Sequence, residues 1–237
     1  MARIDTVDND EPVNVVSQAL QQADEFKTQG NDHFRAKAWS SALSCYQSGL
    51  EALPRRPEKP EKADAHADVD DDENDPPTTQ EPTQPEPPTP EELEYAKARS
   101  VLNSNIGACY LKLGDHKAVV DACTQALLDD PNYVKALQRR AASNETLDTW
   151  SSLTAAMEDY TTLLKILPPS SALIKEIERS QAVLKPRHEA AQKRETDEMM
   201  GKLKGIGNSI LGNFGLSTDN FQFVPNGQGG YSMNFQR

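Results

Sequence analysis

The sequence predicts an all-α fold in which three helix-turn-helix repeats stack as a helical solenoid. Three stretches of the chain follow one template of small and large residues, with a period of about 34 residues. Small residues occur where the two helices of a repeat would touch, and the stretches close on prolines, at Pro54, Pro131 and Pro168. One such repeat cannot bury its apolar face alone, so stacking of the three is expected to form the core.

The first repeat is expected over residues 15–53, after a disordered amino terminus of residues 1–14. Its template residues are Gly30, Phe34, Ala42, Tyr46 and Leu50. The next repeat begins late, because residues 54–92 intervene with ten of the sixteen prolines and with thirteen acidic against four basic residues. This segment has too little apolar surface to offset the entropy cost of ordering it, so we expect a disordered, acidic, proline-rich insertion.

The second and third repeats are expected over residues 93–168. Asp115 follows Gly114 at the turn of the second repeat, which marks a helix boundary. In the third repeat the turn from Thr146 to Leu153 is about three residues longer than the template, and insertions of this kind usually fall in loops. The template residues of these repeats are Gly107, Tyr110, Val119 and Ala126, then Ala141, Ala156 and Tyr160.

Residues 170–204 are expected to form a capping and carboxyl-terminal helix. Ser170 and Ser171 can cap its start, whereas Pro186 should end or kink it. Its apolar residues recur at helical spacing, which suits a helix that covers the open end of a solenoid: Leu173, Ile174, Ile177 and Leu184, with a later stripe of Met199, Met200, Leu203, Ile206, Ile210 and Leu211.

The tail of residues 205–237 has a different pattern. Residues 220–223 and 231–235 alternate apolar and polar side chains on either side of a glycine-rich segment. This alternation predicts two short strands joined by a turn. An isolated hairpin is only marginally stable in water, so we expect it to pack on another element.

The net charge of −12 belongs mainly to the insertion. The balance is −4 for residues 1–53, −9 for residues 54–92 and +1 for residues 93–237, so the helical body is nearly neutral. The overall acidity therefore does not exclude an anionic partner. The cysteines Cys45, Cys109 and Cys123 are not closely spaced, the first residues lack an apolar signal core, and no apolar run approaches the roughly 20 residues of a membrane span, which together predict a cytoplasmic protein.

Five polar residues on the expected first helices of the repeats form the candidate binding site. Lys27 and Asn31 are four residues apart in the first repeat, Asn105 lies in the second, and Lys135 and Arg139 are four apart in the third. A spacing of four places each pair on one side of its helix. Three cations and two amides would then face one groove, where a pair of carboxylates would match the available donors.

The motifs Lys27-x-x-Gly30-Asn31, Ser104-Asn105-x-x-Ala108-x-Tyr110 and Lys135-x-x-x-Arg139 resemble the two-carboxylate clamp of co-chaperone tetratricopeptide repeat (TPR) domains. The resemblance implies that these lysines, asparagines and arginine bind the last aspartate and the free carboxylate of a Glu-Glu-Val-Asp terminus. The implied partners are cytosolic heat-shock chaperones of the 70 kDa and 90 kDa classes. The tail from residue 199 onward, with Phe214-Gly215-Leu216-Ser217-Thr218-Asp219-Asn220-Phe221, is similar to the carboxyl end of the tetratricopeptide repeat protein 1 family.

Two alternatives remain open at this stage. The chain could be a scaffold for signalling proteins such as GTPases, with no dependence on a free carboxyl terminus. The aromatic residues of the tail could pack as core or form an exposed surface for a client protein or a second partner. No motif indicates catalysis, a cofactor, a metal site or nucleic-acid binding, and the three cysteines are expected to be buried and inert.

Overall fold

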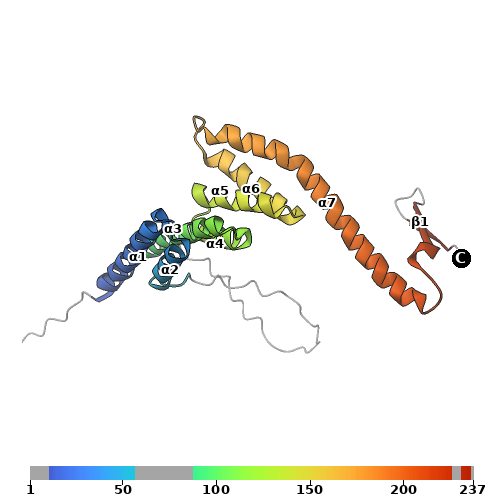
Figure 1. Ribbon diagram of the computed structural model, residues 1–237, viewed down its shortest axis with the longest axis horizontal. Helices are drawn as coiled ribbons and strands as arrows, with labels where there is room; N and C mark the ends of the chain where they lie inside the picture. The colour runs from blue at the N-terminus through green and yellow to red at the C-terminus, as the bar shows by residue number, and fades with distance from the viewer. Residues whose placement is uncertain (1–10, 57–87, 226–230, 236–237) are drawn as a thin grey trace, which may run out of the picture. The chain divides into compact units, whose positions relative to one another are not determined.

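The computed structural model describes residues 11–56, 88–225 and 231–235 (Figure 1). Residues 1–10, 57–87 and 226–230, and with them most of the predicted amino-terminal and acidic disordered segments, lie outside the described residues. The chain divides into two compact units, Met1–Arg140 and Ala141–Arg237.

The first compact unit contains two helix pairs, followed by the start of α5. Helix α1 packs on α2, α2 on α3, and α3 on α4, which confirms the helix-turn-helix pattern of the first two repeats. The bounds of these helices are α1 (Glu11–Arg35), α2 (Trp39–Glu51), α3 (Pro90–Leu113), α4 (His116–Asp129) and α5 (Val134–Leu147).

Two of these helices begin earlier than the sequence suggested. Helix α1 includes residues 11–14, which were expected to be disordered, and α3 includes residues 90–92 of the expected insertion. For α3 the cause is local: the Thr89 hydroxyl accepts a hydrogen bond from the Glu92 amide while the Glu92 carboxylate accepts one from the Thr89 amide. Pro90, whose φ is already helical, occupies the first turn.

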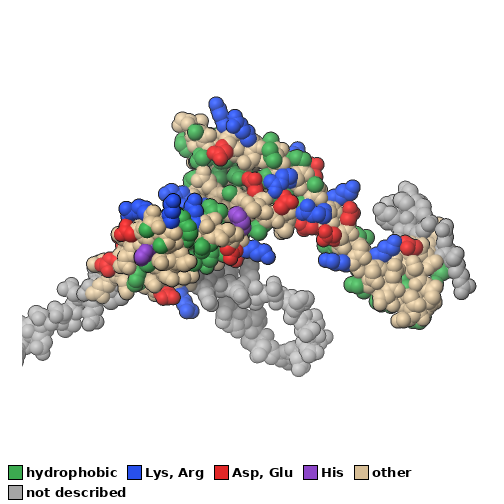
Figure 2. All heavy atoms as spheres, in the orientation of Figure 1, with side chains coloured by type: hydrophobic (Ala, Val, Ile, Leu, Met, Phe, Trp, Pro, Cys, Tyr) green, Lys and Arg blue, Asp and Glu red, His purple; other side chains and the backbone are tan. Residues whose placement is uncertain are grey.

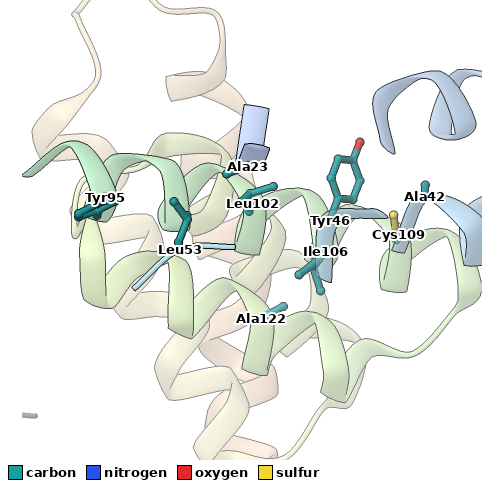
Figure 3. Packing of buried hydrophobic residues seen from close by; sticks show 9 residues of the cluster. All are labelled: Ala23, Ala42, Tyr46, Leu53, Tyr95, Leu102, Ile106, Cys109 and Ala122. Carbon is teal, nitrogen blue, oxygen red and sulfur yellow. The ribbon is translucent and has the colours of Figure 1, made fainter. Parts of the chain in front are cut away.

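Two glycines allow the helices of each pair in this unit to approach closely. A Cβ atom on Gly30 of α1 would lie 2.5 Å from the ring of Tyr46 on α2, and one on Gly107 of α3 would lie 2.9 Å from the sulfur of Cys123 on α4. Any larger side chain would push the helices apart. The predicted small positions therefore have a packing role, next to the core cluster drawn in Figure 3.

The second compact unit contains the end of α5, α6 (Trp150–Ile166) and α7 (Leu173–Gly212), and α7 packs on α6. The long turn predicted between Thr146 and Leu153 is wrong, because α5 ends at Leu147 and α6 begins at Trp150. Thr149 and Ser152 bond each other's amides through their hydroxyls, and this capping box starts α6 early. The extra residues lengthen the helix instead of the turn.

Helix α7 is continuous through Pro186, so of the two predicted outcomes at this proline, an end or a kink, the helix end does not occur. Figure 1 shows α7 as a single helix that bends along its length. Pro186 is exposed, and water can bond the carbonyl that the proline leaves without a backbone partner. At its start Ala172 is the capping position and the predicted serine side-chain cap is absent, while the Ser171 carbonyl accepts a bond from the Ile174 amide at 3.3 Å. Ile177 and Leu184 are buried as expected.

The tail forms the predicted hairpin. The 3-10 helix η1 (Thr218–Asn220) leads into β1 (Phe221–Pro225), which pairs antiparallel with β2 (Tyr231–Phe235) so that Phe221 lies opposite Phe235. The Asn208 side chain of α7 accepts hydrogen bonds from the Thr218 amide and hydroxyl at 2.6 and 2.8 Å. The hairpin is therefore tied to α7 through η1.

Candidate functional site

The first two candidate residues lie one turn apart on α1. Lys27 forms an ion pair with Asp24 on the same helix, and one third of its side chain, 33%, is exposed. The Asn31 side-chain oxygen accepts a hydrogen bond of 2.8 Å from the hydroxyl of Tyr46, which reaches it from α2. The amide of Asn31 is therefore held by a residue of the neighbouring helix.

The other three candidates lie on α3 and α5. Arg139 donates two hydrogen bonds from Nη1 to Ser104, one to its carbonyl at 2.8 Å and one to its hydroxyl at 2.6 Å. The guanidinium of Arg139 therefore lies against α3 at Ser104, the residue before the half-buried Asn105 in the sequence. Lys135 is exposed one turn earlier on α5. Basic side chains are prominent on the face of this unit that Figure 2 presents.

Electrostatics place Arg139 near the first repeat as well. Burial raises the pKa of Tyr46 to about 12, and the charge of Arg139 acts against this shift. Burial likewise raises the pKa of the Cys109 thiol to about 11, again opposed by Arg139. Arg139 is therefore close enough to act on groups of both helix pairs, and Tyr46 keeps its proton at neutral pH.

We expect the first compact unit to lose stability in alkaline solution through these two groups. The contribution of Tyr46 is complete below its unfolded pKa of 10.0 and is lost as the pH rises toward about 12, because the folded state holds the proton more tightly. Urea unfolding between these pH values checks this, with Trp39 as the reporter in a Trp150→Phe background. In Tyr46→Phe the free energy of unfolding should fall less steeply with rising pH than in the parent chain. An equally steep fall would contradict the assignment to Tyr46.

Sequence reasoning missed an ion-pair cluster in the same compact unit. The carboxylate of Asp129, at the end of α4, is 2% exposed and accepts bonds from Arg56 at 2.7 Å and from Arg99 at 2.9 Å. Arg99 also donates to the Pro54 carbonyl at 3.2 Å. The partners are 73 and 30 residues from Asp129, so no local spacing reveals the cluster.

A pocket of about 520 Å³ adjoins the candidate site between α1 and α3. Leu20, Val101 and Leu102 line its apolar part, and Lys27 lies on its wall. The candidate site is therefore continuous with an apolar depression, which the sequence analysis did not anticipate because it depends on side chains from two helices.

The tail aromatics do not all form a core. Phe221 and Phe235 pack edge to face with ring centroids 5.5 Å apart, but Phe235 remains 50% exposed and Phe214 77% exposed. The apolar stripe at the end of α7 is also exposed, with values between 59% and 67% for Met199, Met200, Leu203, Ile206 and Ile210. Burial thus accounts for only part of the apolar surface of the tail.

Comparisons with known proteins give the fold. No family model matches the chain. Sperm-associated antigen 1 of Rattus norvegicus is 45% identical over 73 residues, which are 31% of this chain and 8% of that protein. The first TPR of Spaghetti bound to the HSP90 peptide SRMEEVD is 21% identical, with 69% of this chain and 96% of that chain covered and a TM-score of 0.45.

The C-terminal TPR-containing domain of a Plasmodium falciparum protein described as FK506-binding is 20% identical, with a TM-score of 0.50 over 75% of this chain and 95% of that chain. The chain has a TPR fold. It spans at most 28% of the length of the curated relatives compared, so the TPR similarity concerns a part of each of them. No helix in the described ranges is long and apolar enough to cross a membrane.

Proposed function

We propose that this chain is a co-chaperone adaptor in the cytoplasm. Its TPR groove binds the Glu-Glu-Val-Asp carboxyl termini of heat-shock chaperones of the 70 kDa and 90 kDa classes. The observation that supports this most is the anchoring of Arg139 on Ser104. This contact holds a cation of α5 against α3, the helix that carries Asn105.

The five candidate residues would contribute to the binding of two carboxylates in two ways. Lys27, Lys135 and Arg139 supply positive charge, while Asn31 and Asn105 supply directed N–H groups. Nη1 of Arg139 bonds Ser104, and the guanidinium has further N–H groups that can donate to a ligand. Charge-assisted hydrogen bonds are stronger than neutral ones, which favours a doubly anionic peptide end over an internal acidic side chain.

Isothermal titration calorimetry with the peptide SRMEEVD tests this proposal. The free-acid peptide should bind with a dissociation constant on the order of micromolar, and the same peptide with an amidated carboxyl terminus should bind at least about tenfold more weakly. Equal affinities for the two peptides would rule out the carboxylate clamp. That result would favour the alternative of a signalling scaffold whose groove needs no free carboxyl terminus.

A second part of the proposal concerns the tail, which we assign to the type found in the tetratricopeptide repeat protein 1 family. The exposed stripe that includes Leu203 and Ile206 would contact a client protein, since exposed apolar clusters commonly mark interaction sites. The double variant Leu203→Asp with Ile206→Asp should leave the affinity for the peptide SRMEEVD unchanged. It should no longer capture the client proteins that the wild-type chain captures from a lysate. Retention of the same captured proteins would contradict this part.

A further inference from the structure

We propose that Tyr46 is a positioning residue for peptide binding, which orients the amide of Asn31 so that its N–H groups face the ligand. The proposal rests on the proposed carboxylate clamp and identifies how one of its donors is set. The observation behind it is the 2.8 Å hydrogen bond from the Tyr46 hydroxyl to the Asn31 side-chain oxygen.

The need for such a residue follows from the chemistry of the clamp. Lysine and arginine side chains carry only donors, so any rotamer that reaches a carboxylate presents an N–H group to it. An asparagine side chain carries an oxygen on one side and an NH₂ group on the other, and an ionised carboxylate can only accept. If Asn31 turned its oxygen toward the ligand, two acceptors would oppose each other and the contact would be repulsive.

Tyr46 is suited to prevent this rotation. Its hydroxyl is protonated at neutral pH and can donate, as any tyrosine can, and burial raises the pKa of this phenol further, to about 12. When that O–H group bonds the amide oxygen, the NH₂ group of Asn31 is directed away from Tyr46. The ring itself has little freedom, since Tyr46 is only 2% exposed within the core cluster.

Gly30 is the reason that the hydroxyl can reach Asn31. A Cβ atom at this position would lie 2.5 Å from Cε1 and 2.7 Å from Cδ1 of the Tyr46 ring, far inside van der Waals contact. Because Gly30 has no side chain, the ring of Tyr46 can lie directly against α1. The Tyr46 hydroxyl then reaches Asn31, the next residue of that helix. The pair Gly30-Asn31 thus combines a space for the ring with an acceptor for its hydroxyl.

In the other repeats no such tyrosine hydroxyl bonds a clamp candidate among the described contacts. In the second repeat Cys123 occupies the place over Gly107 that Tyr46 occupies over Gly30, so no tyrosine hydroxyl is supplied there. In the third repeat Tyr160 donates to Glu145, which precedes it by 15 residues just as Asn31 precedes Tyr46. Glu145 is not a clamp candidate, so Tyr160 offers a matched control for the loss of a buried tyrosine hydroxyl.

The test is a double-mutant cycle between Tyr46→Phe and Asn31→Ala, with SRMEEVD as the free acid and as the amide in calorimetry on the full chain. Tyr46→Phe alone should weaken binding of the acid by about 3- to 10-fold and narrow the difference between acid and amide. In the Asn31→Ala background, Tyr46→Phe should have no further effect on peptide affinity. Tyr46 acts on the peptide only through the Asn31 amide, which this background lacks. Tyr160→Phe should leave both affinities unchanged.

The outcomes separate this inference from the proposed function. If the wild-type chain prefers the acid peptide but Tyr46→Phe weakens binding equally in both backgrounds, the clamp stands and the positioning role is overturned. If the wild-type chain does not distinguish the peptides, the clamp fails and the inference about peptide binding fails with it.

A measurement without peptide checks the contact itself. The ¹⁵N–¹H signals of the Asn31 side-chain amide, identified by their loss in Asn31→Ala, should shift in Tyr46→Phe and keep their position in Tyr160→Phe. An unchanged Asn31 signal in Tyr46→Phe would overturn the proposal even if peptide binding were altered. A changed signal supports the orientation of the amide by the Tyr46 hydroxyl.

Discussion

Replacing Asp129 with alanine should lower the free energy of unfolding of the first compact unit by about 3–5 kcal/mol, the usual result when one partner of a buried ion pair is removed. The side chain of Asp129 is 2% exposed, and its loss would leave the guanidinium of Arg99, whose side chain is only 11% exposed, without its carboxylate. Urea unfolding in a Trp150→Phe background measures the effect, because Trp39 then remains as the single tryptophan of the chain.

The control for this substitution is Asp121→Ala on the same helix. Asp121 is exposed on α4, so its removal takes away the same charge without uncovering a buried partner. We expect a change within about 0.5 kcal/mol, as for ordinary surface substitutions. If both variants lose the same small amount, the Asp129 cluster does not stabilise the fold in the way its burial indicates.

Removal of both α5 cations should have the largest effect on peptide affinity. Under the proposed function, Lys135→Ala with Arg139→Ala removes two charge-assisted contacts, each worth about 1.5–3 kcal/mol. We expect SRMEEVD affinity to fall by at least about 100-fold, while the chain keeps its helical circular dichroism. Calorimetry at low and moderate salt measures the loss, which should persist at moderate salt because direct contacts are screened less than distant charges.

A second double variant distinguishes direct contact from net charge. Arg55→Ala with Lys117→Ala removes the same two charges from exposed positions of the first compact unit. This variant should lower the affinity for SRMEEVD only slightly, and the difference from the wild-type chain should shrink as salt is added. Equal losses in the two double variants would contradict a role for Lys135 and Arg139 in the clamp. Loss of chaperone capture with other partners retained would favour the clamp over the scaffold alternative.

The sequence alone was sufficient for the architecture of the helix pairs. Glycine is needed at positions 30 and 107 because a neighbouring side chain occupies the space that a Cβ atom would take. The close packing of the helices can therefore be recognised from the small residues in the sequence. The turn at Gly114 and Asp115 and the paired strands of the tail were also predicted, since both follow from local turn chemistry and alternation. Local rules succeed where the deciding contact lies within a few residues.

The third repeat and Pro186 show where the local prediction was insufficient. The insertion in the third repeat lengthened α6 because the Thr149 and Ser152 capping box made an early helix start favourable. That capping box joins residues only three apart, so it was a local signal that the repeat template did not take into account. Pro186 was expected to end or kink its helix, and α7 continues because its exposed side tolerates a missing backbone bond. Only at Pro186 did the surroundings determine which of two structures the sequence signal produced.

Residue identity and spacing determined on their own that this chain forms paired helices. They also determined that five candidate donors are distributed over the first helices of the three repeats. Only the tertiary structure decided how those donors are held, through Tyr46 on Asn31 and Ser104 on Arg139, and how Asp129 joins Arg56 and Arg99. The physical reason is range. Helical periodicity and capping depend on neighbours within one or two turns, whereas each of these contacts joins different helices and exists only after they have packed.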